Sequence, residues 1–172
     1  MSTETKKYCL DTNVLIEAWN KYYSPTFCPE YWNILNLLGE QGLIFIPRMV
    51  YDEIVRTEDD LARWLKTSKI PIIEIDGKVT QCLKTIYDTD GTHKQLVDST
   101  KNRSLADPWV IAHAMKELAV VVTKEIKITA LNAKRIRIPN VCENMGIRWI
   151  NDFEMIRELN IKFHCAIAPR PI

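Results

Sequence analysis

The sequence predicts an α/β protein with three layers (α/β/α), in which a central parallel sheet of four or five strands lies between helices. Short apolar runs alternate with longer segments of helical periodicity, and this alternation is typical of parallel sheets. The chain has 172 residues, which at about 150 residues per domain favours a single domain spanning residues 1–172. Its composition, with 47% hydrophobic and 26% charged residues, indicates a folded protein with a sizeable core.

The N-terminal third contains the first two expected strands and two helices. Residues 8–10 form a short apolar run, and the cap-forming sequence Asp11-Thr12-Asn13 then opens a helix. Apolar residues at positions 32, 35 and 38 predict a second helix, which ends at Gly39. Residues 43–46 are expected to form a buried strand that Pro47 closes.

The middle third contains further helices and an edge strand. From Arg48 the apolar residues follow a helical period, and a new helix starts at residues 59–60. Residues 70–75 predict a third strand, at an edge of the sheet because Pro71 cannot donate a hydrogen bond to a neighbouring strand. Another helix follows residues 76–77, and the polar residues 88–94 are expected to form a loop.

The last third continues the alternation. Asp107 and Pro108 are suited to the start of a helix, which runs to residue 118 and leads into a strand at residues 119–123. A helix that starts near residues 139–140, a short strand at residues 147–150 and a last helix from Asn151 complete the prediction.

The overall charge argues against a broadly basic nucleic-acid-binding protein. The 23 Lys and Arg residues balance 22 Asp and Glu residues, so a polyanionic partner must be held by a local patch or by a metal. The 5 cysteines are far apart without a C-x-x-C pair, which indicates reduced thiols. Because the N-terminus does not resemble a signal peptide and no apolar run approaches the roughly 20 residues of a membrane span, we expect a cytoplasmic protein without a membrane partner.

Four acidic residues occupy similar positions relative to the expected strands and helices. Asp11 ends the first strand, Glu53 follows the second, Asp107 opens a helix and Glu125 follows the strand at residues 119–123. Because the carboxyl ends of parallel strands share one edge of the sheet, these carboxylates are expected to converge there. A cation would have to neutralise them, and oxygen ligands without His or Cys favour Mg²⁺ or Mn²⁺. This pattern fits metal-dependent hydrolysis of phosphodiesters.

These residues resemble the motifs of the PIN domain, the nuclease fold of VapC-type toxins and of several RNA-processing enzymes. The resemblance covers roughly residues 7–160, and its four blocks come in the order of the family. The blocks are Asp11-Thr12-Asn13-Val14-Leu15-Ile16, Glu53-Ile54, Ala106-Asp107-Pro108-Trp109-Val110-Ile111-Ala112-His113-Ala114 and Val122-Thr123-Lys124-Glu125. The segment from residue 138 to the helix at residues 151–153 is similar to a prokaryotic PIN-like subfamily of largely unknown function.

The resemblance implies a PIN-like fold, Mg²⁺ or Mn²⁺ at the acidic cluster and cleavage of single-stranded RNA. It implies that the catalytic residues and metal ligands are Asp11, Glu53, Asp107 and Glu125. Asn13 and Thr123 would hold these carboxylates or the waters between them. As the toxin of a type II toxin–antitoxin pair, the protein would also bind an antitoxin, and members of the family often form homodimers.

Two departures from the family pattern bear on these roles. Glu125 stands where the family usually has Asp, and the segment from residue 75 to residue 102 is longer than in compact toxins. Basic residues near the expected site are candidates for RNA contacts, and a solvated surface is the alternative explanation for them. These residues are Arg48, Lys127, Lys134, Arg135 and Arg137.

Other interpretations of the same residues remain open. Each acidic residue alone could cap a helix or interact with its dipole. A PIN-like module without catalytic activity, which binds RNA or protein, is the main alternative. A haloacid-dehalogenase-type phosphatase would need D-x-D-x-T, where this chain has Asn13 and Leu15. Ser104 and His113 do not form a convincing nucleophilic triad, and we expect His113 and the five tryptophans to serve packing.

Overall fold

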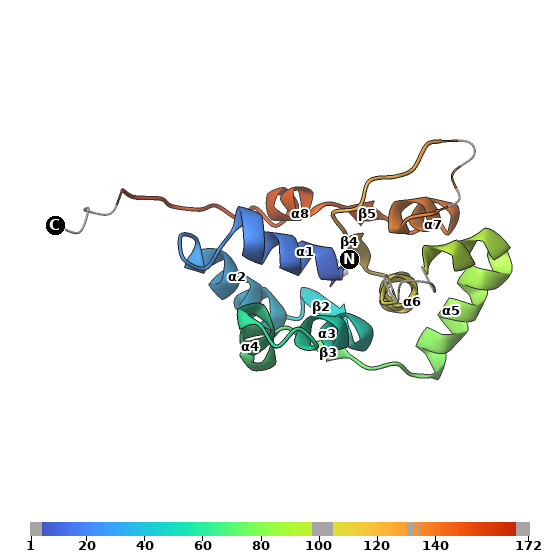
Figure 1. The fold of residues 1–172 in the computed structure, drawn as a ribbon, viewed down its shortest axis with the longest axis horizontal. Coiled ribbons are helices and arrows are strands. Elements are labelled where there is room, and N and C mark those ends of the chain that lie inside the picture. Colours follow the sequence, from blue (N-terminus) through green and yellow to red (C-terminus); the bar gives the residue numbers. More distant parts are fainter. Residues whose placement is uncertain (1–4, 98–104, 131–132, 134, 168–172) are drawn as a thin grey trace.

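A computed structural model describes residues 5–97, 105–130, 133 and 135–167 of the chain (Figure 1). These residues contain a five-stranded sheet in the order β3-β2-β1-β4-β5, and its paired strands are all parallel. The strands are β1 (Tyr8–Leu10), β2 (Ile44–Pro47), β3 (Ile72–Ile73), β4 (Val120–Val122) and β5 (Trp149–Ile150). The predicted parallel sheet of four or five strands is therefore confirmed.

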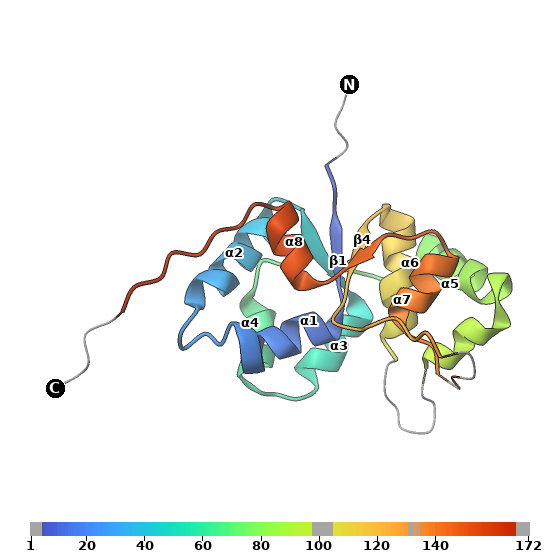
Figure 2. The same ribbon diagram turned by 90° about the horizontal axis from the view of Figure 1, so that it is seen from above.

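Helices cover both faces of this sheet. They are α1 (Thr12–Glu17), the π-helical turn η1 (Ala18–Tyr22), α2 (Pro29–Glu40), α3 (Arg48–Val55), α4 (Asp60–Thr67), α5 (Gly77–Thr89), the 3₁₀ helix η2 (Gly91–Leu96), α6 (Asp107–Glu117), α7 (Ile138–Asn144) and α8 (Asp152–Glu158). Figure 2 shows α1, α2, α4 and α8 on one side of the sheet and α5, α6 and α7 on the other, which confirms the three-layer α/β/α architecture. Within the described ranges, no helix is long and apolar enough to cross a membrane.

The first strand occupies the centre of the sheet. Tyr8 is in register with Ile44 of β2 on one side and with Val120 of β4 on the other. All three residues of β1 are buried, because helices cover both of its faces. Asp11 follows directly and its side chain accepts a hydrogen bond from the Thr12 backbone, so the end of the central strand is also the start of α1.

Two local predictions were wrong in extent or type. The strand predicted at residues 70–75 is reduced to the two residues of β3, although it does lie at an edge of the sheet. The predicted loop at residues 88–94 is helical, because α5 runs to Thr89 and η2 follows. Burial of His93 explains this difference, since its Nδ1 donates to the carbonyl oxygen of Ile86 at 2.7 Å.

The aromatic and histidine packing agrees with the sequence prediction and extends it. Trp32 packs edge-on against Trp19 and Trp64, with ring centroids 4.6 and 4.7 Å away. His113 is fully buried, and its Nδ1 donates to the carbonyl oxygen of Trp109 at 2.8 Å. These rings therefore belong to the packed interior rather than to a site.

Gly39 allows α2 to lie directly against the chain that leads into β3. A Cβ atom at this position would lie 2.5 Å from the carbonyl oxygen of Lys69 and 2.8 Å from the Cα of Ile70. We expect Gly39→Ala to lower the free energy of unfolding by about 1–3 kcal/mol, because backbone atoms would have to move. Gly77→Ala is the matched control, since nothing lies within 4 Å of its position. Chemical denaturation measures both, and equal stabilities for the two variants would contradict the close contact.

Candidate active site

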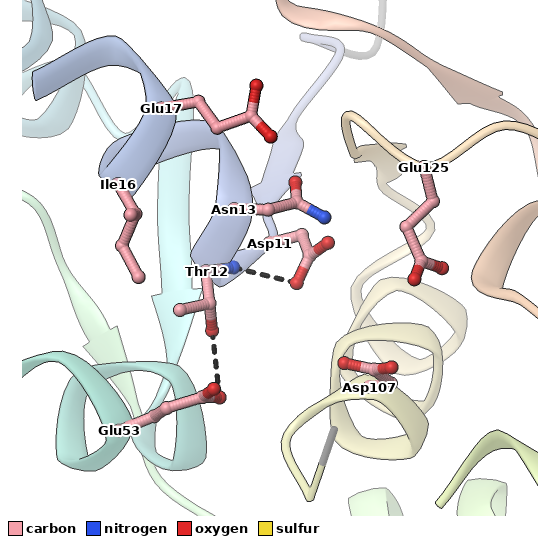
Figure 3. Close-up of a pocket in the computed structure, with 8 residues that line it drawn as sticks. All are labelled: Asp11, Thr12, Asn13, Ile16, Glu17, Glu53, Asp107 and Glu125. Atoms are coloured by element: carbon pink, nitrogen blue, oxygen red, sulfur yellow. Dashed lines mark hydrogen bonds between the residues drawn. The ribbon is translucent and has the colours of Figure 1, made fainter. Parts of the chain in front are cut away.

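A pocket of about 230 Å³ lies where the central strands end (Figure 3). It is lined by Asp11, Thr12, Asn13, Ile16, Glu17, Glu53, Asp107 and Glu125. Asp11 follows β1, Glu53 lies in α3 after β2, Asp107 is the first residue of α6 and Glu125 follows β4. The structure therefore brings together all four acidic residues that the sequence places at strand ends and helix starts.

Asp11 is the most buried of these carboxylates. Its Oδ1 accepts a hydrogen bond from the Thr12 backbone at 2.7 Å, and its Oδ2 accepts one from the Thr123 hydroxyl at 2.8 Å. The pKa of Asp11 is raised to about 7, chiefly by burial and to a smaller extent by the charges of Glu125 and Glu53, although the hydrogen bonds from Thr123 and Thr12 oppose the shift. The pocket thus holds more negative charge than its own hydrogen bonds compensate.

Asn13 lines the pocket, and Thr123 lies beside it in contact with Asp11. The Asn13 amide nitrogen is 3.4 Å from the Thr123 hydroxyl, and its oxygen accepts from the Lys124 backbone at 2.8 Å. The Thr123 hydroxyl also accepts from the Glu125 backbone at 3.1 Å while it donates to Asp11. These contacts join the start of α1 to the turn that follows β4.

Glu53 and Glu125 accept hydrogen bonds from residues of two different helices. The Thr12 hydroxyl donates to Oε2 of Glu53 at 3.1 Å, which ties α3 to the start of α1. The longer side chain of Glu125 reaches the first residue of α7, where Ile138 donates its backbone N–H to Oε2 at 2.8 Å. In Figure 3 the Glu125 carboxylate points toward Asp107, so the position is occupied by a carboxylate despite the departure from the family pattern.

Glu17 is a fifth acidic residue of the pocket, and the sequence analysis missed it. It lies one helical turn after Asn13 in α1, so both side chains share a face of the helix. Its carboxylate also lies 3.8 Å from Nζ of Lys21. The spacing of four residues from Asn13 is the signal that could have identified it.

The oxygen atoms and the negative charge of the pocket suit a divalent cation, but the carboxylates are spread apart. Oxygen ligands around a pocket with uncompensated negative charge are what Mg²⁺ and Mn²⁺ prefer. Among the residues that the structure describes, however, no three His, Cys, Asp or Glu side chains are close enough together to form a ready-made metal-binding group. Mg²⁺ commonly keeps several waters and binds through only one or two carboxylates, so the residues present fit it.

Two of the basic residues expected to contact RNA are engaged elsewhere. Arg48 pairs with Glu74 and lies 3.7 Å from Asp52, and Lys127 pairs with Glu143. Neither basic side chain lines the acidic pocket. Nothing in the structure therefore directs Arg48 or Lys127 toward a ligand in that pocket.

Two other basic residues lie next to the acidic pocket. Arg135 and Arg137 line an adjoining pocket of about 220 Å³, which shares Asp107 and Glu125 with the first. Lys134 lies outside the described residues. A polyanion that crosses the carboxylates would thus meet basic side chains on the α6 and α7 side.

Comparisons with known proteins place the chain among domains of unassigned function. A family model described as a domain of unknown function (DUF4411) matches residues 8–163. The chain is similar in structure to VapBC2 from Rickettsia felis, solved with a DNA fragment from their promoter, at 26% identity and a TM-score of 0.54, covering 84% of this chain and 97% of that one. A toxin–antitoxin complex from Klebsiella pneumoniae is similar at 15% identity and a TM-score of 0.46, covering 77% and 98%. No curated protein sequence matches the chain.

Proposed function

Because this chain belongs to the DUF4411 family of domains of unknown function and has a PIN-like fold, we propose that it is a metal-dependent endoribonuclease. Its substrate would be single-stranded RNA, and it would act as the toxin of a type II toxin–antitoxin pair. The observation that carries the proposal is the pocket in which carboxylates from four separate elements meet. Helix capping accounts for Asp11 at the start of α1, but it does not explain why all four carboxylates face one pocket.

The residues proposed to hold the metal are Asp11, Glu53, Asp107 and Glu125. A bound Mg²⁺ or Mn²⁺ would supply Lewis acidity and lower the pKa of a water that attacks the phosphodiester. Thr123 fixes Oδ2 of Asp11, and Thr12 fixes Oε2 of Glu53, so neither carboxylate has to be ordered when the substrate binds. Glu53 is proposed to orient the attacking water from the α3 side.

The toxin assignment is supported by the similarity to VapBC2 from Rickettsia felis. We propose that an antitoxin protein binds this chain in the cell and that expression without it arrests growth. Induced expression in a bacterial host should stop growth with the wild-type protein and not with Asp107→Asn. Normal growth with abundant, folded wild-type protein would contradict the toxin role but not the nuclease.

The direct test is cleavage of a labelled single-stranded RNA with EDTA, Mg²⁺ or Mn²⁺. We expect cleavage only with a divalent ion, and a loss of about a hundredfold or more in Glu53→Gln and Asp107→Asn. Asp52→Asn is the matched control, because Asp52 is adjacent to Glu53 in α3 but does not line the pocket. Its activity should stay at the wild-type level.

Two results would decide against the proposal. Cleavage that persists in EDTA, or that survives in both pocket variants, would show that the carboxylates do not carry the reaction. No cleavage of any RNA, together with no Mn²⁺ binding by calorimetry, would instead favour a catalytically inactive module that binds RNA or protein.

A further inference from the structure

Two exposed aromatic rings meet on the surface near the acidic pocket. Tyr22 ends η1 and Phe153 lies in the first turn of α8, and their ring centroids are 5.6 Å apart with the planes at 81°. Tyr22 is 43% exposed and Phe153 is 38% exposed. Both rings therefore present apolar surface to solvent, in a fixed edge-to-face arrangement.

A single ammonium group lies behind both rings. Nζ of Lys124 is 4.1 Å from the centroid of the Tyr22 ring and 4.0 Å from that of Phe153. The Lys124 side chain is only 10% exposed, and Nζ lies 2.6 Å from the fully buried carboxylate of Asp152. Lys124 is thus turned inward, where it fixes the two rings rather than reaching into solvent.

This arrangement is costly for the folded protein. Neither carboxylate oxygen of Asp152 makes a hydrogen bond with the residues that the structure describes, although the ion pair with Lys124 is close. Burying an ion pair removes two charges from water, and leaving two aromatic rings exposed gains little from the hydrophobic effect. The contacts with Lys124 hold the two rings in place but do not require either ring to remain exposed.

The backbone of Lys124 joins the ring pair to the acidic pocket. Lys124 lies between Thr123, which donates to Asp11, and Glu125, which lines the pocket. The helix that begins beside the pocket at Thr12 continues through η1 to Tyr22, a path of about 15 Å or less at 1.5 Å per residue. The rings are therefore within reach of a short single strand that crosses the carboxylates.

We propose that Tyr22 and Phe153 form a stacking site for an unpaired base of the single-stranded RNA whose backbone crosses the acidic pocket. This inference rests on the proposed nuclease function. Every base has a π face, so exposed aromatic rings bind single strands by stacking with little dependence on sequence. The strand would then run from the ring pair beside α1 and α8, over the carboxylates, toward Arg135 and Arg137 on the α6 and α7 side.

Continuity with the pocket favours RNA over a protein as the occupant. The turn at residues 123–125 supplies both the ammonium group behind the rings and a carboxylate of the pocket. A single strand bound to the rings could therefore also reach the pocket.

The test is the affinity for a short fluorescent single-stranded RNA, measured by anisotropy in EDTA so that the RNA is not cut. We expect Tyr22→Leu/Phe153→Leu to bind about tenfold more weakly than the wild type, because leucine keeps the apolar bulk but has no π face. Tyr22→Trp should retain wild-type affinity. Phe27→Leu is the matched control, since Phe27 is 65% exposed and forms no ring pair with another described residue.

A second measurement locates the base that stacks. RNAs with an abasic site at successive positions should show one position at which the wild type loses affinity, and the double variant should lose none there. Thermal unfolding establishes that the double variant is folded. If the double variant is not folded, the affinities of the single variants Tyr22→Leu and Phe153→Leu for the same RNAs are measured instead.

The outcomes separate this inference from the proposed function. Equal RNA affinity in the wild type and a folded leucine variant would overturn the stacking site, as would an equal loss in Phe27→Leu. Either result leaves metal-dependent cleavage intact. If the wild type neither binds nor cuts single-stranded RNA, the proposed function fails, and the stacking site fails with it.

Discussion

Asp11→Asn is expected to reduce RNA cleavage by about a thousandfold or more and, in the same protein, to stabilise the metal-free fold at alkaline pH. The loss of activity follows from removing a proposed metal ligand, since several kcal/mol of stabilisation of the transition state correspond to this factor. The gain in stability follows from the burial of Asp11 among other carboxylates.

The pH dependence of this gain has a definite sign. In the folded protein the pKa of Asp11 is about 7 instead of 3.8, so the folded state holds the proton more tightly than the unfolded chain does. The wild type without metal should therefore lose stability as the pH rises from about 4 to about 7, on the order of 2–4 kcal/mol in total. Asparagine stays neutral, so the variant escapes this loss, and the two proteins should differ at pH 8 but not below pH 4.

Chemical denaturation in EDTA at several pH values measures this difference. Asp59→Asn is the control, because Asp59 also caps a helix but is exposed, and the Ala62 backbone N–H lowers its pKa. That variant should not gain stability at pH 8 and should cleave RNA normally. If the free energy of unfolding of the wild type stays constant from pH 4 to pH 8, folding does not raise the pKa of Asp11.

Lys124→Met is expected to lower the free energy of unfolding by about 3–5 kcal/mol. The substitution removes the cation that lies 2.6 Å from Asp152 and leaves a fully buried carboxylate without its charge partner. Leaving a buried charge without a partner is among the most destabilising effects that a single substitution can have. For a protein of this size, we expect a fall in Tm on the order of 10 °C.

Two further variants isolate the cause of this loss. Lys124→Met/Asp152→Leu should recover much of the lost stability, since no unpaired charge remains. Lys127→Met also breaks an ion pair, with Glu143, but both partners are exposed, so its effect should stay below about 1 kcal/mol. Denaturation curves for the set provide the comparison. Equal losses in Lys124→Met and Lys127→Met would mean that Asp152 finds another partner or a proton.

The fold and the acidic pocket could be predicted because their signals are local. The run at residues 8–10 is entirely apolar because both faces of β1 are covered, and Asp11 follows it as a helix cap. Since parallel strands end at one edge, placing one acidic residue after each strand or at a helix start was enough to bring Asp11, Glu53, Asp107 and Glu125 together.

The remaining features depend on contacts that the local pattern does not contain. Residues 88–94 look like a loop because they are polar, but α5 continues to Thr89, Asp90 caps η2, and His93 is buried against Ile86. Lys124 and Asp152 look like surface charges, because their pairing requires β4, α8 and η1 to be in place. Glu17 differs from these residues, because its spacing of four residues from Asn13 is a local signal that could have identified it.

The central position of β1 also affects how the protein is made on the ribosome. β1 is synthesised first, but it pairs with β4, which leaves the ribosome more than a hundred residues later. Asp11 meets Thr123 and Glu125 only then, so a nascent chain that has not reached this point has no complete pocket. Under the proposed function, a chain released early by a stalled or truncated message would be harmless to the RNA around it, and an antitoxin would have to meet only finished molecules.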